Sequence, residues 1–336
     1  MEAGLQKKKL EEFSQTKPQE LSLFEFLIPE NKYSNSIELY DFIPKYYWGK
    51  MERLKVENHK KEVLTILERI FEYRGKQYEV RIIPATVMDE NGIEKDYYPS
   101  YKEEIIEDAL RKMVCDGQGI FLDDQAGITF SLYELKKELK RIGHQYNDEQ
   151  IKKAFMVCSR ATIEVTRKDG AKILSSHIFG AVGLQTFEEW KNKNNVKCYV
   201  QFNPLVTTSI KNKTFRQINY ESTMSYKTVI ARQLHKRMSH HYTQASLTNP
   251  YSILLTTIIR DFGLTRYQNL NMNLRDAKLA LEEMKEKEVI LEYKIEKTIE
   301  VQKRNKLIDI KFLITPHPTF SNEMRIGNSI YSKINK

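Results

Sequence analysis

The apolar positions of residues 225–316 predict three successive helices. The second is expected to start at Pro250 and to end at Gly263, a residue type that tolerates the left-handed position after a helix. Asn273 is expected to cap the start of the third. The inward positions are Tyr226, Ile230, Leu234 and Met238 in the first helix, Leu254, Ile258 and Phe262 in the second, and Leu274, Ala277, Leu281 and Met284 in the third.

Two runs rich in β-forming residues follow these helices. They span 289–299 and 307–315 and are joined by the polar, basic stretch 302–305. Three helices followed by a hairpin predict a winged helix-turn-helix.

Residues 100–178 repeat this order of elements. Ser100 with Glu103 and Ser131 with Glu134 form two capping boxes, and Asn147 caps a third helix. The strands expected after these helices span 162–166 and 171–178. A further strand is expected at 198–202.

Before this unit lies a β-rich section, 37–98, which starts with a short helix at 37–43. Arg74-Gly75 and Asn91-Gly92 mark its turns. The predicted fold class is therefore α+β, with two tandem winged helix-turn-helix domains and an N-terminal β-rich extension. The expected divisions are a flexible tail at 1–35, an N-terminal winged-helix domain at 36–204 and a C-terminal DNA-binding winged-helix domain at 205–336.

Charge separates these two domains. Residues 205–336 contain 22 Lys and Arg against 12 Asp and Glu, whereas the first 204 residues contain 32 against 33. No acidic residue occurs between Ser222 and Arg260, where five basic ones do. A one-sided positive excess beside a helix-turn-helix pattern is typical of a DNA-binding surface.

The third helix of the basic unit is the predicted reading element. With its apolar stripe inside, Arg275 and Lys278 share the outer face; arginine suits a guanine edge or a phosphate. The predicted DNA-binding residues are Arg275, Lys278, Asn271 and Asn273 at this helix, Lys303, Arg304 and Lys306 at the wing, and the phosphate anchors Lys227, Lys236 and Arg237. In the nearly neutral first unit, a secondary DNA-binding or dimerising role is expected of Lys152, Lys153, Arg160, Arg167 and Lys168.

Motifs for catalysis, nucleotide binding and metal binding do not occur in the sequence. It contains no Walker A loop, no HEXXH, no paired CxxC and no GxSxG. His240 and His241 are adjacent, and with His235 they are expected along the first basic helix, adding positive potential near phosphate. The chain is thus predicted to be a non-enzyme without cofactor or metal.

Three scattered cysteines suit a reducing cytoplasm, and no apolar run approaches the length of a membrane span. The predicted location is the cytoplasm; a bacterial cytoplasm is implied by the family resemblance described below.

An apolar island lies in the N-terminal tail. Leu21, Ser22, Leu23 and Phe24 resemble the last four positions of the sliding-clamp-binding pentapeptide of bacterial replication proteins, with Glu20 in place of its glutamine. Two readings remain open: a docking peptide for a partner's groove, or a segment that packs on the first domain.

Residues 225–292 resemble the DNA-reading domain of iteron-binding plasmid replication initiators, and 128–165 their first winged helix. The resemblance covers roughly 100–316 and implies that the second winged helix binds direct repeats in double-stranded origin DNA, while the first assists binding or dimerises. In this family monomers open the origin, and homodimers often repress their own gene. The resemblance also implies host initiator, replicative helicase and sliding clamp as partners.

Two other functions remain open. A transcriptional regulator with the same fold would bind an operator, and inverted repeats would favour it. A nicking replication enzyme is disfavoured because the histidine motif of such enzymes is missing.

Overall fold

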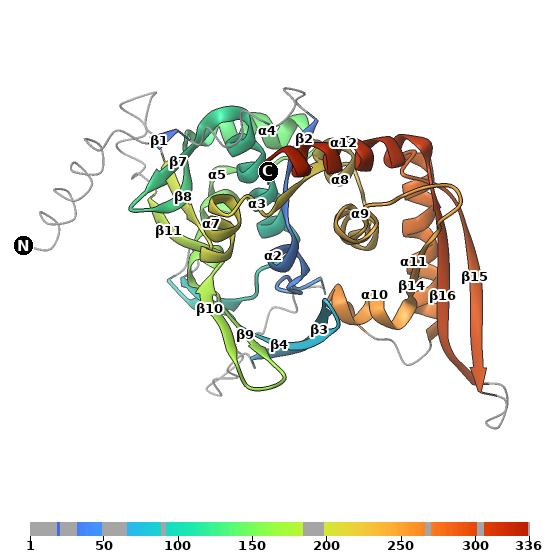
Figure 1. Cartoon of the computed structure of the whole chain (residues 1–336). Coiled ribbons are helices and arrows are strands. Elements are labelled where there is room, and N and C mark those ends of the chain that lie inside the picture. The colour runs from blue at the N-terminus through green and yellow to red at the C-terminus, as the bar shows by residue number, and fades with distance from the viewer. Residues whose placement is uncertain are drawn as a thin grey trace, which may run out of the picture.

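The computed structural model describes residues 19–20, 32–48, 66–88, 92–183, 198–265, 270–300 and 306–334. They form a mixed α+β fold with several small antiparallel sheets (Figure 1). Two large hydrophobic clusters divide the chain: one holds buried residues from Ile37 to Met224, the other from Tyr226 to Met324.

The C-terminal unit has the predicted order of three helices and a hairpin. Helix α9 carries the expected stripe, of which Leu234 and Met238 are fully buried. Its elements are α9 (Val229–His241), β14 (Tyr251–Leu254), α10 (Leu255–Asp261), α11 (Leu270–Glu286), β15 (Ile290–Glu300), β16 (Lys306–Pro316) and α12 (Pro318–Ile334).

Two boundaries in this unit correct the predictions. Pro250 does not start a helix, because the next four residues form strand β14 and pair with β16, Leu254 opposite Lys311. Leu254 is consequently 39% exposed instead of lying on an inner helix face. Asn273 is not an N-cap, because α11 begins at Leu270, three residues earlier.

The N-terminal unit is built on the predicted caps. Ser100, Ser131 and Asn147 each form a complete capping box with the residue three positions later. The unit's elements are α3 (Tyr101–Met113), β7 (Gly119–Leu122), β8 (Gln125–Phe130), α4 (Leu132–Arg141), α5 (Asp148–Arg160), β9 (Thr162–Arg167) and β10 (Lys172–His177). A π-helical turn, Val114–Gln118, links α3 to β7.

The β-rich extension widens the sheet of this unit. Strands β3 (Leu67–Tyr73) and β4 (Lys76–Ile83) form the predicted hairpin, and Arg74 and Gly75 both have positive φ at its turn. Strand β4 pairs with β9, which gives the order β10-β9-β4-β3. A second hairpin, β5 (Ala85–Met88) and β6 (Glu94–Tyr97), packs on α5.

The segment after β12 (Cys198–Phe202) returns to the N-terminal core. Strand β13 (Phe215–Asn219) pairs with β2 (Tyr33–Ile37), and buried residues up to Met224 join the first cluster. The remaining elements are β1 (Gln19–Glu20), which pairs with β7, α2 (Glu38–Phe42), β11 (Phe179–Gly183), α7 (Pro204–Lys211) and α8 (Tyr220–Met224).

None of the helices in the described ranges is both long and apolar enough to span a membrane.

Two glycines allow a matched test of this packing. A Cβ added to Gly127 in β8 would lie 2.5 Å from the carbonyl oxygen of Val200, whereas one added to Gly327 in α12 meets nothing within 4 Å. We expect Gly127→Ala to destabilise the protein by about 1–3 kcal/mol, because strand β12 must shift. Gly327→Ala should stabilise it by up to about 1 kcal/mol, because alanine is the better helix former.

Denaturant titration of both variants measures the two effects. Equal stability of Gly127→Ala and the wild-type protein would contradict the β8–β12 packing.

Candidate nucleic-acid interface

Helix α11 is fixed against the core of the C-terminal unit by one face only. Leu274, Ala277, Leu281 and Met284 are buried there, as predicted. The opposite face is exposed and carries Asn271, Arg275, Lys278 and Glu282. The sequence therefore identified correctly which side of this helix faces outwards.

Arg275 is a strongly exposed cation on the outer face of α11. Its side chain is 71% exposed, and its guanidinium lies 3.5 Å from the Asp276 carboxylate. An ion pair this exposed contributes little stability, so it can be exchanged for a ligand at small cost. Arg275 and Lys278 together give the outer face of α11 two cationic groups for bases or phosphates.

The prediction for Asn273 is wrong. This residue is 4% exposed, and its side-chain amide donates to the backbone oxygen of Thr265 at 3.0 Å. The hydrogen bond holds the segment before α11 against the helix. Asn273 thus supports the start of α11 and does not present its amide to a ligand.

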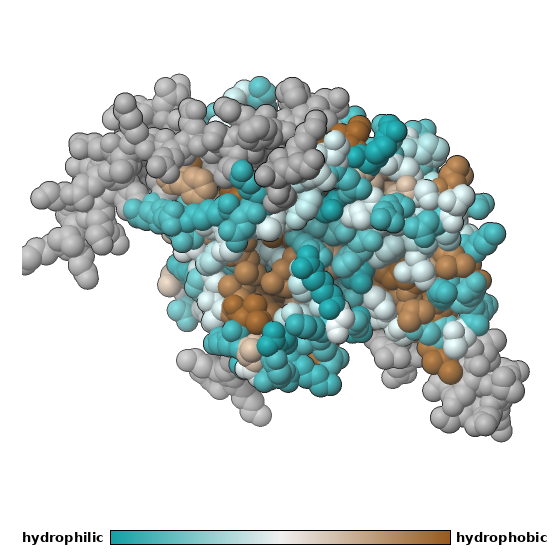
Figure 2. Space-filling view, viewed as in Figure 1, coloured by the Kyte–Doolittle hydropathy of each residue, from teal (hydrophilic) through white to brown (hydrophobic). Residues whose placement is uncertain are grey.

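The predicted wing is a long antiparallel hairpin beside α11. Strands β15 and β16 pair from Ile290 with Pro316 to Glu300 with Lys306, and their tip projects from the body of the protein (Figure 1). In the space-filling view, apolar and hydrophilic side chains are interspersed over this side of the molecule (Figure 2). Lys303 and Arg304 lie outside the described residues, and of Lys306 only the backbone is described.

Of the three predicted phosphate anchors near α9, only Lys227 is exposed. Lys236 is 8% exposed and Arg237 is paired with Asp261 at 3.0 Å, so these two predictions are corrected. Both cations are neutralised by carboxylates inside the protein.

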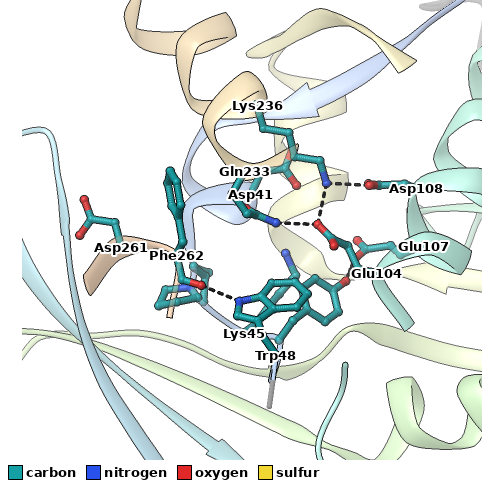
Figure 3. A pocket seen from close by; sticks show the side chains of 13 residues that line it. Asp41, Lys45, Trp48, Glu104, Glu107, Asp108, Gln233, Lys236, Asp261 and Phe262 are labelled. Carbon is teal, nitrogen blue, oxygen red and sulfur yellow. Dashed lines mark hydrogen bonds and ion pairs between the residues drawn. The ribbon is translucent and has the colours of Figure 1, made fainter. Parts of the chain in front are cut away.

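Lys236 belongs to a buried ionic cluster between the two units. From α9 it reaches Asp108 Oδ2 at 2.6 Å and Glu104 Oε1 at 3.1 Å, both on α3 (Figure 3). Arg232 Nε lies 3.0 Å from the other oxygen of Glu104, and Gln233 donates to the same carboxylate at 2.6 Å. Two cations of the basic unit are therefore matched by two carboxylates of the neutral one.

The cluster continues into the N-terminal unit. Arg111 lies 2.6 Å from Asp41 and also donates to Asn35, while the Tyr46 hydroxyl donates to Glu107. Burial alone would raise the pKa of Asp41, but Arg111 overcomes this effect and holds that pKa well below its usual range. Asp41 is thus ionised at neutral pH in the folded protein.

A second group of contacts joins α10 to the β-rich extension. Trp48 Nε1 donates to the backbone oxygen of Phe262 at 2.6 Å (Figure 3). Asp261 accepts from the backbone N–H of Glu72 at 3.2 Å, and Arg260 lies 3.2 Å from the Glu72 carboxylate. The helix that precedes α11 is therefore held by residues near the N-terminus of the chain.

His235 and His240 of α9 do not add positive potential, contrary to prediction. His235 is fully buried, and burial lowers its pKa to about 3. His240 Nε2 forms a hydrogen bond with Ser36 Oγ at 2.8 Å, and burial lowers the pKa of His240 to about 4. Both are neutral near pH 7. Within the described part of the chain, no group of His, Cys, Asp and Glu is arranged to hold a metal ion.

In the first unit, the β5–β6 hairpin covers the C-terminal half of α5. Val87 packs on Val157 and Ala161 in a small separate cluster. Lys153 lies over the Tyr97 ring at 3.7 Å, and Arg160 donates to the backbone oxygen of Thr86 at 3.1 Å. This helix is therefore less accessible to DNA than α11.

The other cations predicted for this unit lie at its periphery. Lys152 is 3.7 Å from Glu149, Arg167 is 2.6 Å from Asp169, and Lys168 is exposed at the turn between β9 and β10.

The ionic cluster predicts a large effect of a single uncharged substitution. Lys236→Met should lower the free energy of unfolding by about 3–5 kcal/mol, because buried Asp108 would lose its partner at 2.6 Å and keep only Arg111 at 3.9 Å. Lys140→Met, an exposed control on α4, should change it by no more than about 0.5 kcal/mol. Adding Asp108→Leu to Lys236→Met should restore most of the loss. Denaturant titration measures the free energy of unfolding of all three variants. Equal values for Lys236→Met and Lys140→Met would contradict the buried ion pair between Lys236 and Asp108.

Stability should also depend on pH through His240. Its folded pKa of about 4 lies below the usual value of 6.5, so the unfolded chain binds an extra proton between these values. Stability should therefore fall as the pH drops from about 6.5 to 4, with a slope of about 1.4 kcal/mol per pH unit for each such histidine. His240→Gln, which can keep a hydrogen bond to Ser36, should reduce this slope by the contribution of one proton, about 1.4 kcal/mol per pH unit. An unchanged slope in denaturant titrations between pH 7 and 4.5 would contradict the neutral, buried state.

No family model and no curated protein matches this chain. Among solved structures, the fold is similar to domains 2 and 3 of RctB, in two crystal structures with TM-scores of 0.46 and 0.44, each at 8% sequence identity. These matches cover 85% and 76% of this chain, and 99% and 92% of the RctB chains.

The fold also matches the Pi initiator protein, crystallised in complex with iteron DNA, with a TM-score of 0.42 and 13% identity over 70% of this chain and 98% of that one. Likenesses of this size leave the DNA contacts of the present chain to be inferred from its own residues.

Proposed function

We propose that this protein is a sequence-specific, double-stranded DNA-binding protein that initiates plasmid replication from repeated origin sites. Both units are winged helix-turn-helix domains in this proposal, and the C-terminal one reads the DNA through α11. The single observation that carries the DNA-binding role is the exposed outer face of α11. There Arg275 and Lys278 project beside the β15–β16 hairpin, on the unit that holds the positive excess of the chain.

The contacts divide by type. Arg275 is assigned to a base edge, and Asn271 to a base or the backbone near the start of α11. Lys278, Lys227 and the wing cations Lys303, Arg304 and Lys306 are assigned to phosphates. Lys236 and Arg237 are removed from the phosphate set because their charges are matched inside the protein.

The first unit has a supporting role in this proposal. Its α5 is partly covered by β5 and β6, which favours contact with DNA phosphates or a second copy over base reading. We propose that the two units divide at Ser225, because one hydrophobic cluster ends at Met224 and the other begins at Tyr226; the sequence alone predicts the division at 205.

Recruitment belongs to the same proposal. The initiator would open an A·T-rich origin and bring host initiator, helicase and sliding clamp to it. Residues Leu21, Ser22, Leu23 and Phe24 are the candidate clamp contact; they lie outside the described residues.

A DNase footprint on the DNA that flanks the protein's own gene tests the function. We expect evenly spaced protection of direct repeats, one or two helical turns apart. Protection of a single inverted repeat over the promoter would instead identify a transcriptional regulator, because dimer symmetry is mirrored in the site. Absence of any sequence-specific protection would refute both.

A substitution tests the reading residue. Arg275→Ala should weaken binding to the protected repeat by about 1–3 kcal/mol and leave random duplex much less affected, because it removes a base contact. Arg325→Ala, an exposed arginine on α12, serves as the control and should leave both affinities unchanged. An equal loss of affinity for the specific and the random duplex would show that Arg275 contacts a phosphate instead of a base.

A further inference from the structure

The exposed face of α11 also carries two large apolar side chains. Met272 is 43% exposed and Leu279 is 57% exposed. They are seven residues apart, so they lie within about 20° of each other around the helix axis. Arg275 stands between them, three residues after one and four before the other, on the same side of the helix.

This arrangement divides the outer face into two edges. Helical spacing places Asn271 and Lys278, also seven residues apart, on the edge away from Met272 and Leu279, with Arg275 between the two pairs. Single exposed apolar residues are common on protein surfaces. Here, however, two of them lie in register along the helix that presents the exposed arginine, and the adjacent cations match a polyanionic ligand.

The major groove of DNA offers an apolar group that fits such an edge. Thymine presents its 5-methyl group there, next to the hydrogen-bonding edges of neighbouring bases. Seven residues of helix span about 10.5 Å, which corresponds to about three base pairs at 3.4 Å each. A helix lying along the groove could therefore contact two methyl groups on either side of a guanine bound by Arg275.

We propose that Met272 and Leu279 are specificity-determining residues that read thymine methyl groups flanking the base bound by Arg275. This inference rests on the proposed function and refines it by naming the base chemistry of the site. It predicts a recognition sequence in which two thymines lie about three base steps apart, with a guanine between them.

Uracil substitution tests this directly, because uracil lacks the methyl group and keeps every hydrogen-bonding group of thymine. Duplexes of the protected repeat are made with each thymine replaced in turn by uracil, and binding is measured by titration. The wild-type protein should lose about fourfold in affinity at one or two positions, the factor that corresponds to returning one buried methyl-sized group to water.

Substitution of the protein identifies the contacting side chain. Leu279→Ala and Met272→Ala should each bind thymine and uracil equally at one of these positions, and should still discriminate at the other. Alanine is favourable in a helix, so both variants should fold, which circular dichroism checks. Leu247→Ala is the matched control, since Leu247 is 58% exposed but lies outside α11; it should discriminate as the wild-type protein does.

Two failures are distinguishable. If the wild-type protein binds every uracil duplex as well as the thymine duplex, while Arg275→Ala still weakens specific binding, the methyl-reading role is wrong and the DNA-reading role of α11 stands. If no sequence-specific binding occurs at all, the proposed function fails and the apolar pair must face a different partner.

Discussion

The buried ionic cluster between α3 and α9 is the constraint on which the arrangement of the protein depends. Two cations of the C-terminal unit, Arg232 and Lys236, lie against Glu104 and Asp108 of the N-terminal unit at 2.6–3.1 Å. Each group would be costly to bury alone, so the four must be brought together in one geometry. The cluster therefore specifies how the units face each other more strongly than it stabilises either of them.

This constraint also determines which surfaces remain for a ligand. Because α9 places Arg232 and Lys236 against α3 and Arg237 against Asp261, that helix cannot offer these cations to DNA. The contacts of Trp48 with Phe262 and of Glu72 with Asp261 hold α10, the helix before α11, from the same side. Helix α11 is left with one face on the core and one face open. The positive charge of the C-terminal unit is thus divided between buried ion pairs and the exposed face of α11, to which the proposed function assigns DNA binding.

Local features of the fold were predictable from the sequence, and long-range ones were not. The capping boxes at Ser100 and Ser131 and the outward face of α11 follow from spacing within a few residues. Strand β14 was missed because four residues after a proline fit a helix as well as a strand, and only pairing with β16 decides. Lys236 was misassigned because its partner Asp108 lies 128 residues away, and a lysine on a basic helix looks the same whether it faces water or a buried carboxylate.

The central claim, that α11 reads bases in the major groove through Arg275, is tested most directly by methylation interference at guanine N7. Duplexes of the protected repeat are lightly methylated, and bound and free fractions are compared for wild-type protein and Arg275→Ala. The account predicts one guanine per repeat whose methylation blocks the wild-type protein and has no further effect on the variant. If methylation of that guanine interferes equally with both proteins, the claim is contradicted. Base reading would then be assigned to another element.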